Sequence, residues 1–297
     1  MTKVLIVGAT GLVGSNLVKA CKEQGKEVRA LVRSATLANS AKMNLLRASA
    51  AVICEGALED FGSLVRACEG VEAVISAVGA AQIVQQTELI KAAKQTSVKR
   101  FIPSDYGLDP KVAGEGSCLL FDLKAQIHRA IKEAGLNYTF VHAPGFFEYW
   151  AYSLGQVGLT SPPEEVQLYG EGTVKAALAS VSDIAKVTAA AVDDPRTQNK
   201  ELHITANIFS QEELIRLWEQ ISGKRVKRIP VRLADLERII ASSTTPDTLM
   251  NLILAQLARS VWIRGDVVKR PTGALEATEL YADMRFSSVK EALAQLV

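Results

Sequence analysis

Apolar residues in the first half of the chain alternate between two kinds of spacing. Short continuous apolar runs, typical of strands buried on both faces, are separated by stretches in which apolar residues recur at helical spacing. The continuous run at residues 4–7 predicts a strand, and strand-like segments follow at 27–32, 51–54, 73–77, 100–103 and 138–142. The helical spacing predicts helices at 12–21, 42–50, 59–68, 87–95 and 118–134. Strict alternation of strand and helix predicts an α/β fold with a doubly wound parallel sheet.

The pattern changes after about Pro144. Gly and Pro accumulate in GQVGLTSPPEE and YGEGT, and helical spacing returns at residues 182–191, 211–220, 233–241 and 248–258. We therefore expect a sheet domain over residues 1–150 and a smaller region over residues 151–297 that is partly interleaved with it.

Three glycines follow the first predicted strand, in the run GATGLVG. Gly8 permits a sharp turn, Gly11 lets the backbone approach a pyrophosphate, and Gly14 lets the next helix pack close to the strand. The N-terminus of that helix offers unpaired N–H groups and a positive dipole end to phosphates. We predict a dinucleotide site in a Rossmann-type domain, with an ordinary glycine turn as the alternative. The expected contacts are Gly8, Thr10, Gly11, Leu12, Val13 and Gly14.

The end of the second predicted strand indicates which dinucleotide is bound. NAD-binding proteins place an acidic residue there, whereas this chain has Arg33 followed by Ser34. A guanidinium clamps a 2′-phosphate that a carboxylate would repel. We therefore expect NADP(H), with contacts from Arg33 and Ser34; a solvated arginine at a strand end is the alternative.

Composition excludes several classes of function. The net charge of the 297 residues is +2, so no charge imbalance points to nucleic acid or to an anionic membrane. Lys224-Arg225 and Lys227-Arg228 are short clusters, which we interpret as a solvated helix end or loop. No apolar run approaches the roughly 20 residues that span a bilayer, and the N-terminus lacks a signal-peptide pattern. We expect a soluble, cytoplasmic protein that binds neither nucleic acid nor membrane.

The four cysteines point to a reducing compartment. None of them has C-x-x-C spacing, and they fall in segments that read as core or helix: Cys21, Cys54, Cys68 and Cys118. Neither zinc nor a disulfide framework is expected, and no metal site is predicted.

Several longer segments, taken in order, resemble a known family. VISAVG, KRFIPSDYG, FDLKAQIHRAIKEAGLNYTFV, DDPRTQNK and GDVVKRPTGALEATELYADMRFSSVKEAL follow GATGLVG along the chain. Together they resemble the isoflavone reductase-like branch of the NmrA-like family of atypical short-chain dehydrogenases. That branch includes pinoresinol–lariciresinol, phenylcoumaran benzylic ether and isoflavone reductases and eugenol synthases. The resemblance covers essentially the whole chain and implies an NADPH-dependent oxidoreductase.

The resemblance also implies a catalytic lysine on the helix after the RFIPS strand, which is Lys124 in FDLKAQIHR. Leu120 stands where classical short-chain dehydrogenases carry a tyrosine, as is usual in this branch. A lysine beside the nicotinamide and a phenolic substrate binds ribose hydroxyls and accepts or relays a proton. Without the resemblance, a surface lysine is the alternative. His128 lies one turn further along, where it faces the same way or is simply packed.

The remaining contacts are implied by the same resemblance. Cofactor contacts are expected from Ala77, Val78, Gly79, Ser104 and Lys124, and from Pro144, Gly145 and Phe146. The last three belong to the run Ala143-Pro144-Gly145-Phe146, where plant reductases tend to have Ser-Asn-Cys-Phe. A substrate pocket is expected from Tyr106, Phe147, Tyr149 and Trp150, with packing in the core as the alternative. Glu148 is a polar pocket group or is exposed, and His203 reads as a strand residue with no partner.

The resemblance implies hydride transfer from NADPH to a phenolic or related conjugated small molecule of the phenylpropanoid, lignan or isoflavonoid kind, with Lys124 as base or proton relay. Residues 151–297 would then bind the substrate, and residues 151–173 would close over it. One alternative is a non-catalytic NADP(H)-binding redox sensor, against which Lys124 and the GALEATELY segment argue. Another is a quinone or carbonyl reductase. A homodimer is common in this family and is expected here.

Overall fold

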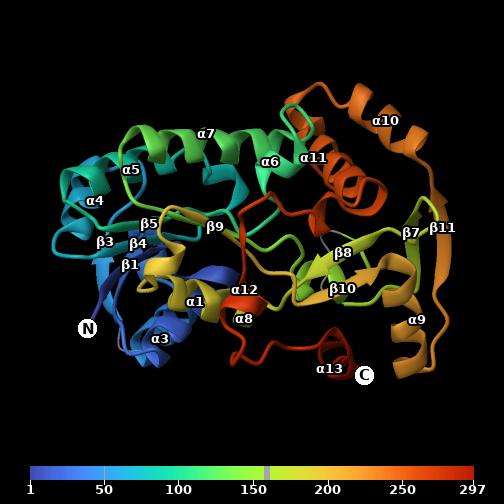
Figure 1. Ribbon diagram of the computed structural model, residues 1–297, viewed down its shortest axis with the longest axis horizontal. Helices are drawn as coiled ribbons and strands as arrows, with labels where there is room; N and C mark the ends of the chain where they lie inside the picture. Colours follow the sequence, from blue (N-terminus) through green and yellow to red (C-terminus); the bar gives the residue numbers. More distant parts are fainter. Residues whose placement is uncertain (50, 157–160) are drawn as a thin grey trace. The chain divides into compact units, whose positions relative to one another are not determined.

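The computed structural model of the chain describes residues 1–49, 51–156 and 161–297 (Figure 1). The chain divides into two compact units, each built from three segments. The first unit comprises Met1–Tyr106, Leu123–Val141 and Val181–Leu202, and the second comprises Gly107–Asp122, His142–Ser180 and His203–Val297. The units are interleaved and do not follow a single boundary at residue 150, because Val181–Leu202 returns to the first unit.

A parallel five-stranded sheet forms the centre of the first unit, in the order β3-β2-β1-β4-β5. Its strands are β1 (Lys3–Val7), β2 (Glu27–Val32), β3 (Val52–Glu55), β4 (Ala73–Ser76) and β5 (Arg100–Ile102). β1 pairs with β2 and β4, and its residues Val4, Leu5 and Ile6 are fully buried. This is the strand order of a dinucleotide-binding α/β fold, so the predicted Rossmann-type sheet is confirmed. β6 (Thr139–His142) and β9 (Lys200–His203) are neighbours in a second sheet.

Helices cover both faces of this sheet, as the doubly wound prediction requires (Figure 1). They are α1 (Leu12–Glu23), α2 (Ser34–Leu37), α3 (Ser40–Ala48), α4 (Phe61–Cys68), α5 (Gln86–Gln95), α7 (Leu119–Glu133) and α8 (Val181–Ala191), with short 3-10 turns at Ala80–Gln82 and Pro195–Thr197. Helix α8 packs along α1, which is why its segment rejoins the first unit. The sequence pattern missed the single turn α2, and the predicted end of α3 at Ala50 lies outside the described residues.

The sequence pattern predicted three helices of the second unit, α9 (Gln211–Ser222), α10 (Leu233–Ser242) and α11 (Leu249–Ala258), but it missed several of the strands. The other helices are α6 (Pro110–Ala113), α12 (Ala277–Leu280) and α13 (Val289–Ala294), with π-turns at Phe147–Ala151 and Arg259–Ile263 and 3-10 turns at Pro246–Thr248 and Asp266–Val268. The strands are β7 (Glu165–Tyr169), β8 (Lys175–Leu178), β10 (Asn207–Ser210), β11 (Lys227–Val231) and β12 (Leu275–Glu276). β7 pairs with β11 in parallel, and β8 pairs with β10 antiparallel.

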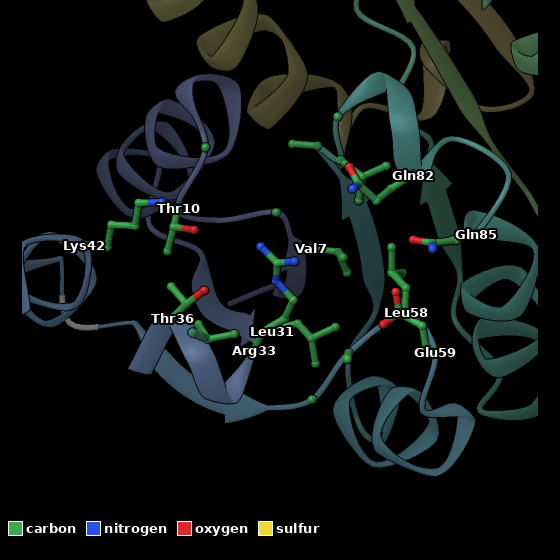
Figure 2. Close-up of a pocket in the computed structure, with 18 residues that line it drawn as sticks. Val7, Thr10, Leu31, Arg33, Thr36, Lys42, Leu58, Glu59, Gln82 and Gln85 are labelled. Atoms are coloured by element: carbon green, nitrogen blue, oxygen red, sulfur yellow. The ribbon is translucent and has the colours of Figure 1, made fainter. Parts of the chain in front are cut away.

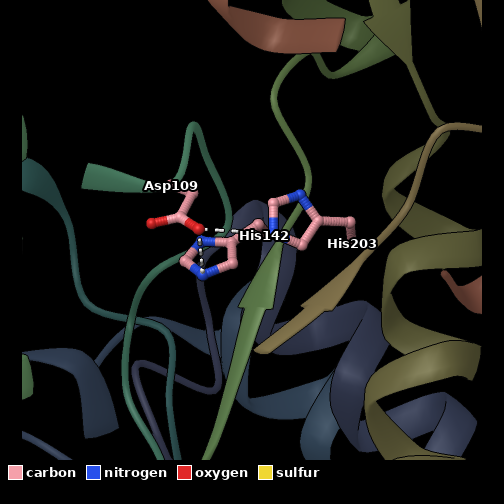
Figure 3. A group of neighbouring side chains, drawn as sticks. All are labelled: Asp109, His142 and His203. Carbon is pink, nitrogen blue, oxygen red and sulfur yellow. Dashed lines mark ion pairs between the residues drawn. The ribbon is translucent and has the colours of Figure 1, made fainter. Parts of the chain in front are cut away.

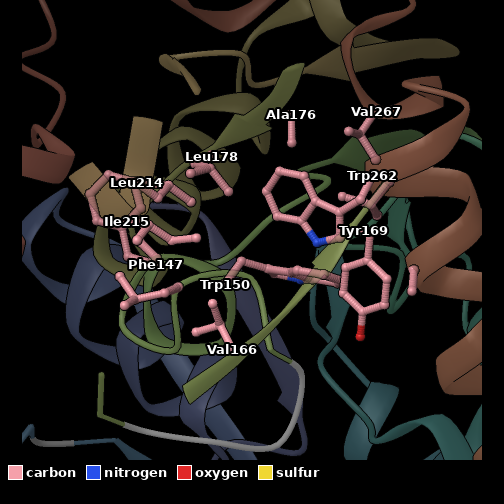
Figure 4. Packing of buried hydrophobic residues seen from close by; sticks show 14 of the residues in the cluster. Phe147, Trp150, Val166, Tyr169, Ala176, Leu178, Leu214, Ile215, Trp262 and Val267 are labelled. Carbon is pink, nitrogen blue, oxygen red and sulfur yellow. The ribbon is translucent and has the colours of Figure 1, made fainter. Parts of the chain in front are cut away.

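The core of the second unit is built around two tryptophans (Figure 4). The rings of Trp150 and Trp262 meet edge to face with their centroids 5.8 Å apart, an arrangement that aromatic pairs favour. Trp262 is 1% exposed, and its indole N–H donates to the carbonyl of Gly155 at 3.2 Å. The buried indole nitrogen is therefore satisfied within the unit.

Among the described residues, no helix is both long enough and apolar enough to cross a membrane.

Candidate functional site

A pocket of about 250 Å³ opens in the first unit beyond the C-terminal ends of β1, β2 and β4 (Figure 2). This is the edge of a parallel sheet where ligands bind in doubly wound folds. Seven of the expected cofactor contacts line it: Gly8, Thr10, Gly11, Arg33, Ala77, Val78 and Gly79. The pattern had not singled out other lining residues, among them Thr36, Lys42, Glu59, Gln82 and Gln85.

Two glycines of the turn leave no room for a side chain. Gly8 has φ +81°, and a Cβ there would lie 2.4 Å from the carbonyl oxygen of Ala77. A Cβ at Gly14 would lie 2.0 Å from the carbonyl oxygen of Gly8. The sharp turn and the close approach of helix to strand both depend on glycine, as the sequence indicated. Leu12, Val13 and Gly14 form the first turn of α1 and do not line this pocket.

The N-terminus of α1 suits a phosphate. Its N-cap is Gly11, which supplies no side-chain hydrogen bond to the first turn. Unpaired backbone N–H groups and the positive end of the helix dipole are what an anion needs there. The pocket therefore fits the phosphates of a dinucleotide.

Arg33 reaches into this pocket from the end of β2, and Lys42 and Thr10 lie to one side of it (Figure 2). A guanidinium and an ammonium in one pocket favour a 2′-phosphate. Lys42 was not identified from the sequence because it lies inside a predicted helix with no phosphate motif. The hydroxyl of Ser34 donates to Glu55 and does not line the pocket, so Ser34 is turned away from the predicted contact.

Lys124 is buried on α7, with 7% of its surface exposed. Its Nζ donates to the backbone carbonyl of Asp105. The preceding residue, Ser104, donates from Oγ to the carbonyl of Val78 at 2.7 Å, and Val78 lines the pocket. Ser104 and Lys124 are thus connected to the pocket wall through Val78, although neither lines the pocket directly. The surface-lysine alternative for Lys124 does not hold.

His128 lies one turn after Lys124 and contacts the same residue. Its Nε2 lies 2.6 Å from Oδ2 of Asp105, and both side chains are buried. The imidazole ring stacks on Phe140 with centroids 3.7 Å apart. Asp105 thus contacts Lys124 through its carbonyl and His128 through its carboxylate. The sequence placed both basic residues on one helix face but did not reveal Asp105 as their partner.

Tyr106 follows Asp105 and is packed inside the first unit. It has φ +23°, a conformation that non-glycine residues seldom adopt, and it is 8% exposed. Burial raises the pKa of its hydroxyl, with further contributions from Cys21 of α1 and from Asp105, while Thr188 of α8 opposes the shift. These neighbours favour packing in the core over a pocket wall, and the hydroxyl is buried as well.

The aromatic run after β6 belongs to the second unit and divides into two kinds of residue. Phe147 and Trp150 are buried in the core (Figure 4), and Trp150 also lines a pocket of about 630 Å³ with Tyr169 and Leu236. Tyr149 is 39% exposed and stacks on Phe146 with centroids 5.8 Å apart. Phe147 is therefore best described as a core residue rather than as part of a pocket wall.

Other residues of that run have simpler surroundings. Gly145 packs closely on β8, since a Cβ there would lie 2.5 Å from Leu178. Pro144 and Glu148 are half-buried.

A second buried group lies in the second unit and was not identified from the sequence. Asp109, His142 and His203 bring their side chains together (Figure 3). Burial alone would raise the pKa of Asp109, but the facing imidazoles of His203 and His142 and the N–H of Lys111 lower it to about 2. His203, for which the sequence gives no partner signal, faces the carboxylate of Asp109 here. The three residues are far apart in the chain, so no local motif could have revealed the group.

Comparisons with known proteins agree with this geometry. The NmrA-like family matches residues 1–293. The chain is 39% identical over 307 residues to phenylcoumaran benzylic ether reductase IRL1 of Ginkgo biloba, with 100% of this chain and 99% of the relative covered. It is 38% identical to eugenol synthase 1 of Petunia hybrida, with 98% and 97% covered.

A solved structure extends the agreement to the fold. AtPrR2 with NADP+ and (+)pinoresinol matches with a TM-score of 0.90 at 33% identity, covering 100% of this chain and 99% of that one. The resemblance seen in the motifs is confirmed, and the chain belongs to the NmrA-like family.

Proposed function

We propose that this protein reduces a conjugated phenolic or related aromatic small molecule with hydride from NADPH, and that Lys124 carries the proton. The observation that carries the proposal is the position of Lys124. It is buried, and its Nζ is held on Asp105, beside the residue whose hydroxyl bonds the wall of the nucleotide pocket.

The enzyme class and the cofactor expected from the sequence are confirmed. The relatives are a reductase and a synthase from the same branch, and the solved neighbour contains NADP+. The chain is an NADPH-dependent oxidoreductase. The pocket of the first unit fits that cofactor, since Gly8 and Gly14 keep the turn free of side chains and Arg33 and Lys42 supply cations.

Lys124 suits a proton-transfer role. When bound, NADPH supplies a hydride from its nicotinamide ring. The carbon that receives it must be electron-poor, as in a quinone methide or an enone. We propose that Lys124 accepts the proton of a substrate phenol at Nζ while the bond between that carbon and its leaving oxygen breaks, so that the oxygen departs with the bonding electron pair and takes a proton from water. After hydride has reached the carbon, Lys124 returns its proton to the phenolate of the reduced product. Asp105 and Ser104 would hold the lysine in place.

The aromatic substrate class rests on the names of the relatives and on one surface feature. Those names include a phenylcoumaran benzylic ether reductase and a eugenol synthase, and the solved neighbour contains pinoresinol. Phe146 and Tyr149 present a stacked aromatic surface that is partly exposed. Residues 151–173 remain a proposed cover for the substrate; of these, 157–160 lie outside the described residues.

The first test is Lys124→Ala, assayed for NADPH oxidation against lignans, phenylcoumarans, isoflavonoids, coniferyl esters and quinones. We expect turnover on one of these classes to fall by about 10²- to 10⁴-fold, the usual contribution of a proton-transfer group, while NADPH binding is retained. Lys91→Ala is the matched control, because Lys91 also lies on a helix of the first unit but is 64% exposed.

The same assay separates the alternatives. Turnover that survives in Lys124→Ala would exclude the proton role. Absence of turnover on every class in the wild type, with NADPH still bound, would favour a redox sensor. Turnover on quinones alone would favour a quinone reductase. The expected homodimer stays a prediction, which light scattering on the purified protein checks.

A further inference from the structure

Three buried side chains of the second unit converge on one point (Figure 3). Asp109 caps the N-terminus of α6, His142 ends β6 and His203 ends β9. They are 1%, 0% and 2% exposed, and their ligand atoms all lie within 4.8 Å of one another. Figure 3 shows dashed ion-pair lines from one carboxylate oxygen of Asp109 to both imidazole rings.

The distances within this group are longer than those of ordinary hydrogen bonds. Oδ2 of Asp109 lies 3.4 Å from Nε2 of His203 and 3.8 Å from Nε2 of His142. Among the described residues, neither Oδ2 of Asp109 nor Nε2 of His203 has a hydrogen-bond partner. Buried polar atoms without partners are rare in native proteins. These two atoms would therefore be satisfied by a ligand bound between the side chains.

The same distances suit a shared cation. Zinc binds imidazole nitrogen and carboxylate oxygen at about 2.0–2.2 Å, which places neighbouring ligand atoms of a tetrahedral site about 3.3–3.5 Å apart. Two imidazoles and a carboxylate are a donor set for zinc and related transition metals rather than for magnesium or calcium. We propose that Asp109, His142 and His203 bind a divalent transition metal ion, zinc first among the candidates.

The surroundings hold these ligands in place. Oδ1 of Asp109 accepts from the backbone N–H of Lys111 at 2.9 Å, which leaves Oδ2 for the ion. The carbonyl of His142 accepts from the N–H of Ile204 at 3.0 Å, which keeps the ends of β6 and β9 together. Partners of this kind orient metal ligands and support affinity.

The ion would connect three segments that are distant in the sequence. Among the described residues, the group contains three His, Cys, Asp or Glu ligands, so the fourth position falls to a water or another small ligand. An ion that binds only the folded state stabilises it in proportion to its concentration. The ion would therefore stabilise the folded chain, an effect that does not depend on the proposed reductase activity.

The test uses the whole chain purified without a histidine tag. We expect stoichiometric zinc by elemental analysis, or, after removal of metal with a chelator, saturable binding of Zn²⁺ by calorimetry and a rise in melting temperature. Co²⁺ should give the intense visible absorption of a tetrahedral site with nitrogen ligands.

The chain supplies its own matched control, because it has three histidines and the third, His128, lies outside the group. His142→Gln and His203→Gln should each weaken Zn²⁺ binding by more than about 10-fold, the loss that even an outer partner causes. His128→Gln should retain the wild-type affinity for Zn²⁺.

Two results would overturn the proposal. One is a wild-type chain that binds neither Zn²⁺ nor Co²⁺. The other is binding that is equal in all three variants, which would mean that the metal sits elsewhere. If His142→Gln and His203→Gln do not fold, the Co²⁺ spectrum of the wild type decides alone, because a six-coordinate surface ion absorbs only weakly.

Discussion

Gly14 and Gly11 belong to one turn but differ in the space around their α-carbons. A Cβ at Gly14 would meet two backbone atoms of Gly8, at 2.0 and 2.7 Å, whereas a Cβ at Gly11 would meet only the carbonyl oxygen of Gly8, at 3.3 Å. Gly11 also has φ −81°, which any residue adopts. The fold therefore requires glycine at position 14 but not at position 11, where we expect the bound cofactor to need the space.

This difference predicts separate effects for two small substitutions. Gly14→Ala should lower the free energy of unfolding by about 1–3 kcal/mol, the usual cost of forcing a methyl group into a packed site. The free energy of unfolding of Gly11→Ala should lie within about 0.5 kcal/mol of the wild-type value, but this variant should bind NADPH more weakly. Urea denaturation and NADPH titration measure the two effects. An equal loss of stability in both variants would contradict this account of the turn.

Single residues could be predicted from the sequence where their role is local. Gly8 and Arg33 follow strands directly, so the strand pattern alone placed both at the pocket. Asp109, His142 and His203 come from three separate segments, and their meeting depends on how those segments pack. Asp105 is an intermediate case. The family resemblance implied Lys124 in FDLKAQIHR, but it did not reveal that the Asp105 carbonyl accepts a hydrogen bond from that lysine.

The strands of the second unit show why element prediction failed there. β11 reads KRIPV, with two cations and a proline, and from the sequence its Lys227-Arg228 cluster is interpreted as a solvated helix end or loop. It pairs with β7 alone in a two-stranded sheet, where an edge strand tolerates proline. The strands β1, β2 and β4 of the first unit are mostly buried and contain no proline, and the pattern placed them within a residue or two.

The charge at the start of β11 is paired rather than solvated. Arg228 donates from Nη1 to Glu219 of α9 at 2.7 Å and from Nη2 at 3.1 Å, and it also bonds Glu212. The hydrogen bonds from Arg228, with that from the N–H of Val226, lower the pKa of Glu219 to about 2. This group of charges fastens β11 to α9.

The direction of that shift predicts a pH dependence. A carboxyl with a lowered folded-state pKa stabilises the fold above its ordinary pKa of about 4.3 and loses that contribution as the pH falls towards 2. Glu219→Gln should therefore cost about 0.5–1 kcal/mol at neutral pH, and its difference from wild type should shrink between about pH 5 and pH 2. Glu133→Gln, on an exposed position of α7, is the control. A difference that stays constant with pH would argue against the ion pair.

At the scale of the whole molecule, the two units share one chain that passes repeatedly between them. Each unit is built from three segments, so neither can be cut out as a continuous piece. Both units contain a buried cysteine. Cys21 and Cys68 are buried in the first unit and Cys118 is buried in the second, whereas Cys54 on β3 is half-buried. Burial raises the pKa of Cys21 and of Cys68 to about 12, so both are protonated at neutral pH and unreactive.

These thiols predict how the interleaved chain unfolds. In the native protein a thiol reagent should modify Cys54 first, and Cys54→Ser should remove that fast reaction. In the Cys54→Ser variant, the three buried thiols should become reactive over the same range of urea, because interleaved segments couple the unfolding of the two units. Mass spectrometry of the labelled peptides measures each site separately. If Cys118 reacts at lower urea than Cys21 and Cys68, the second unit opens by itself, and the crossings of the chain do not enforce cooperativity.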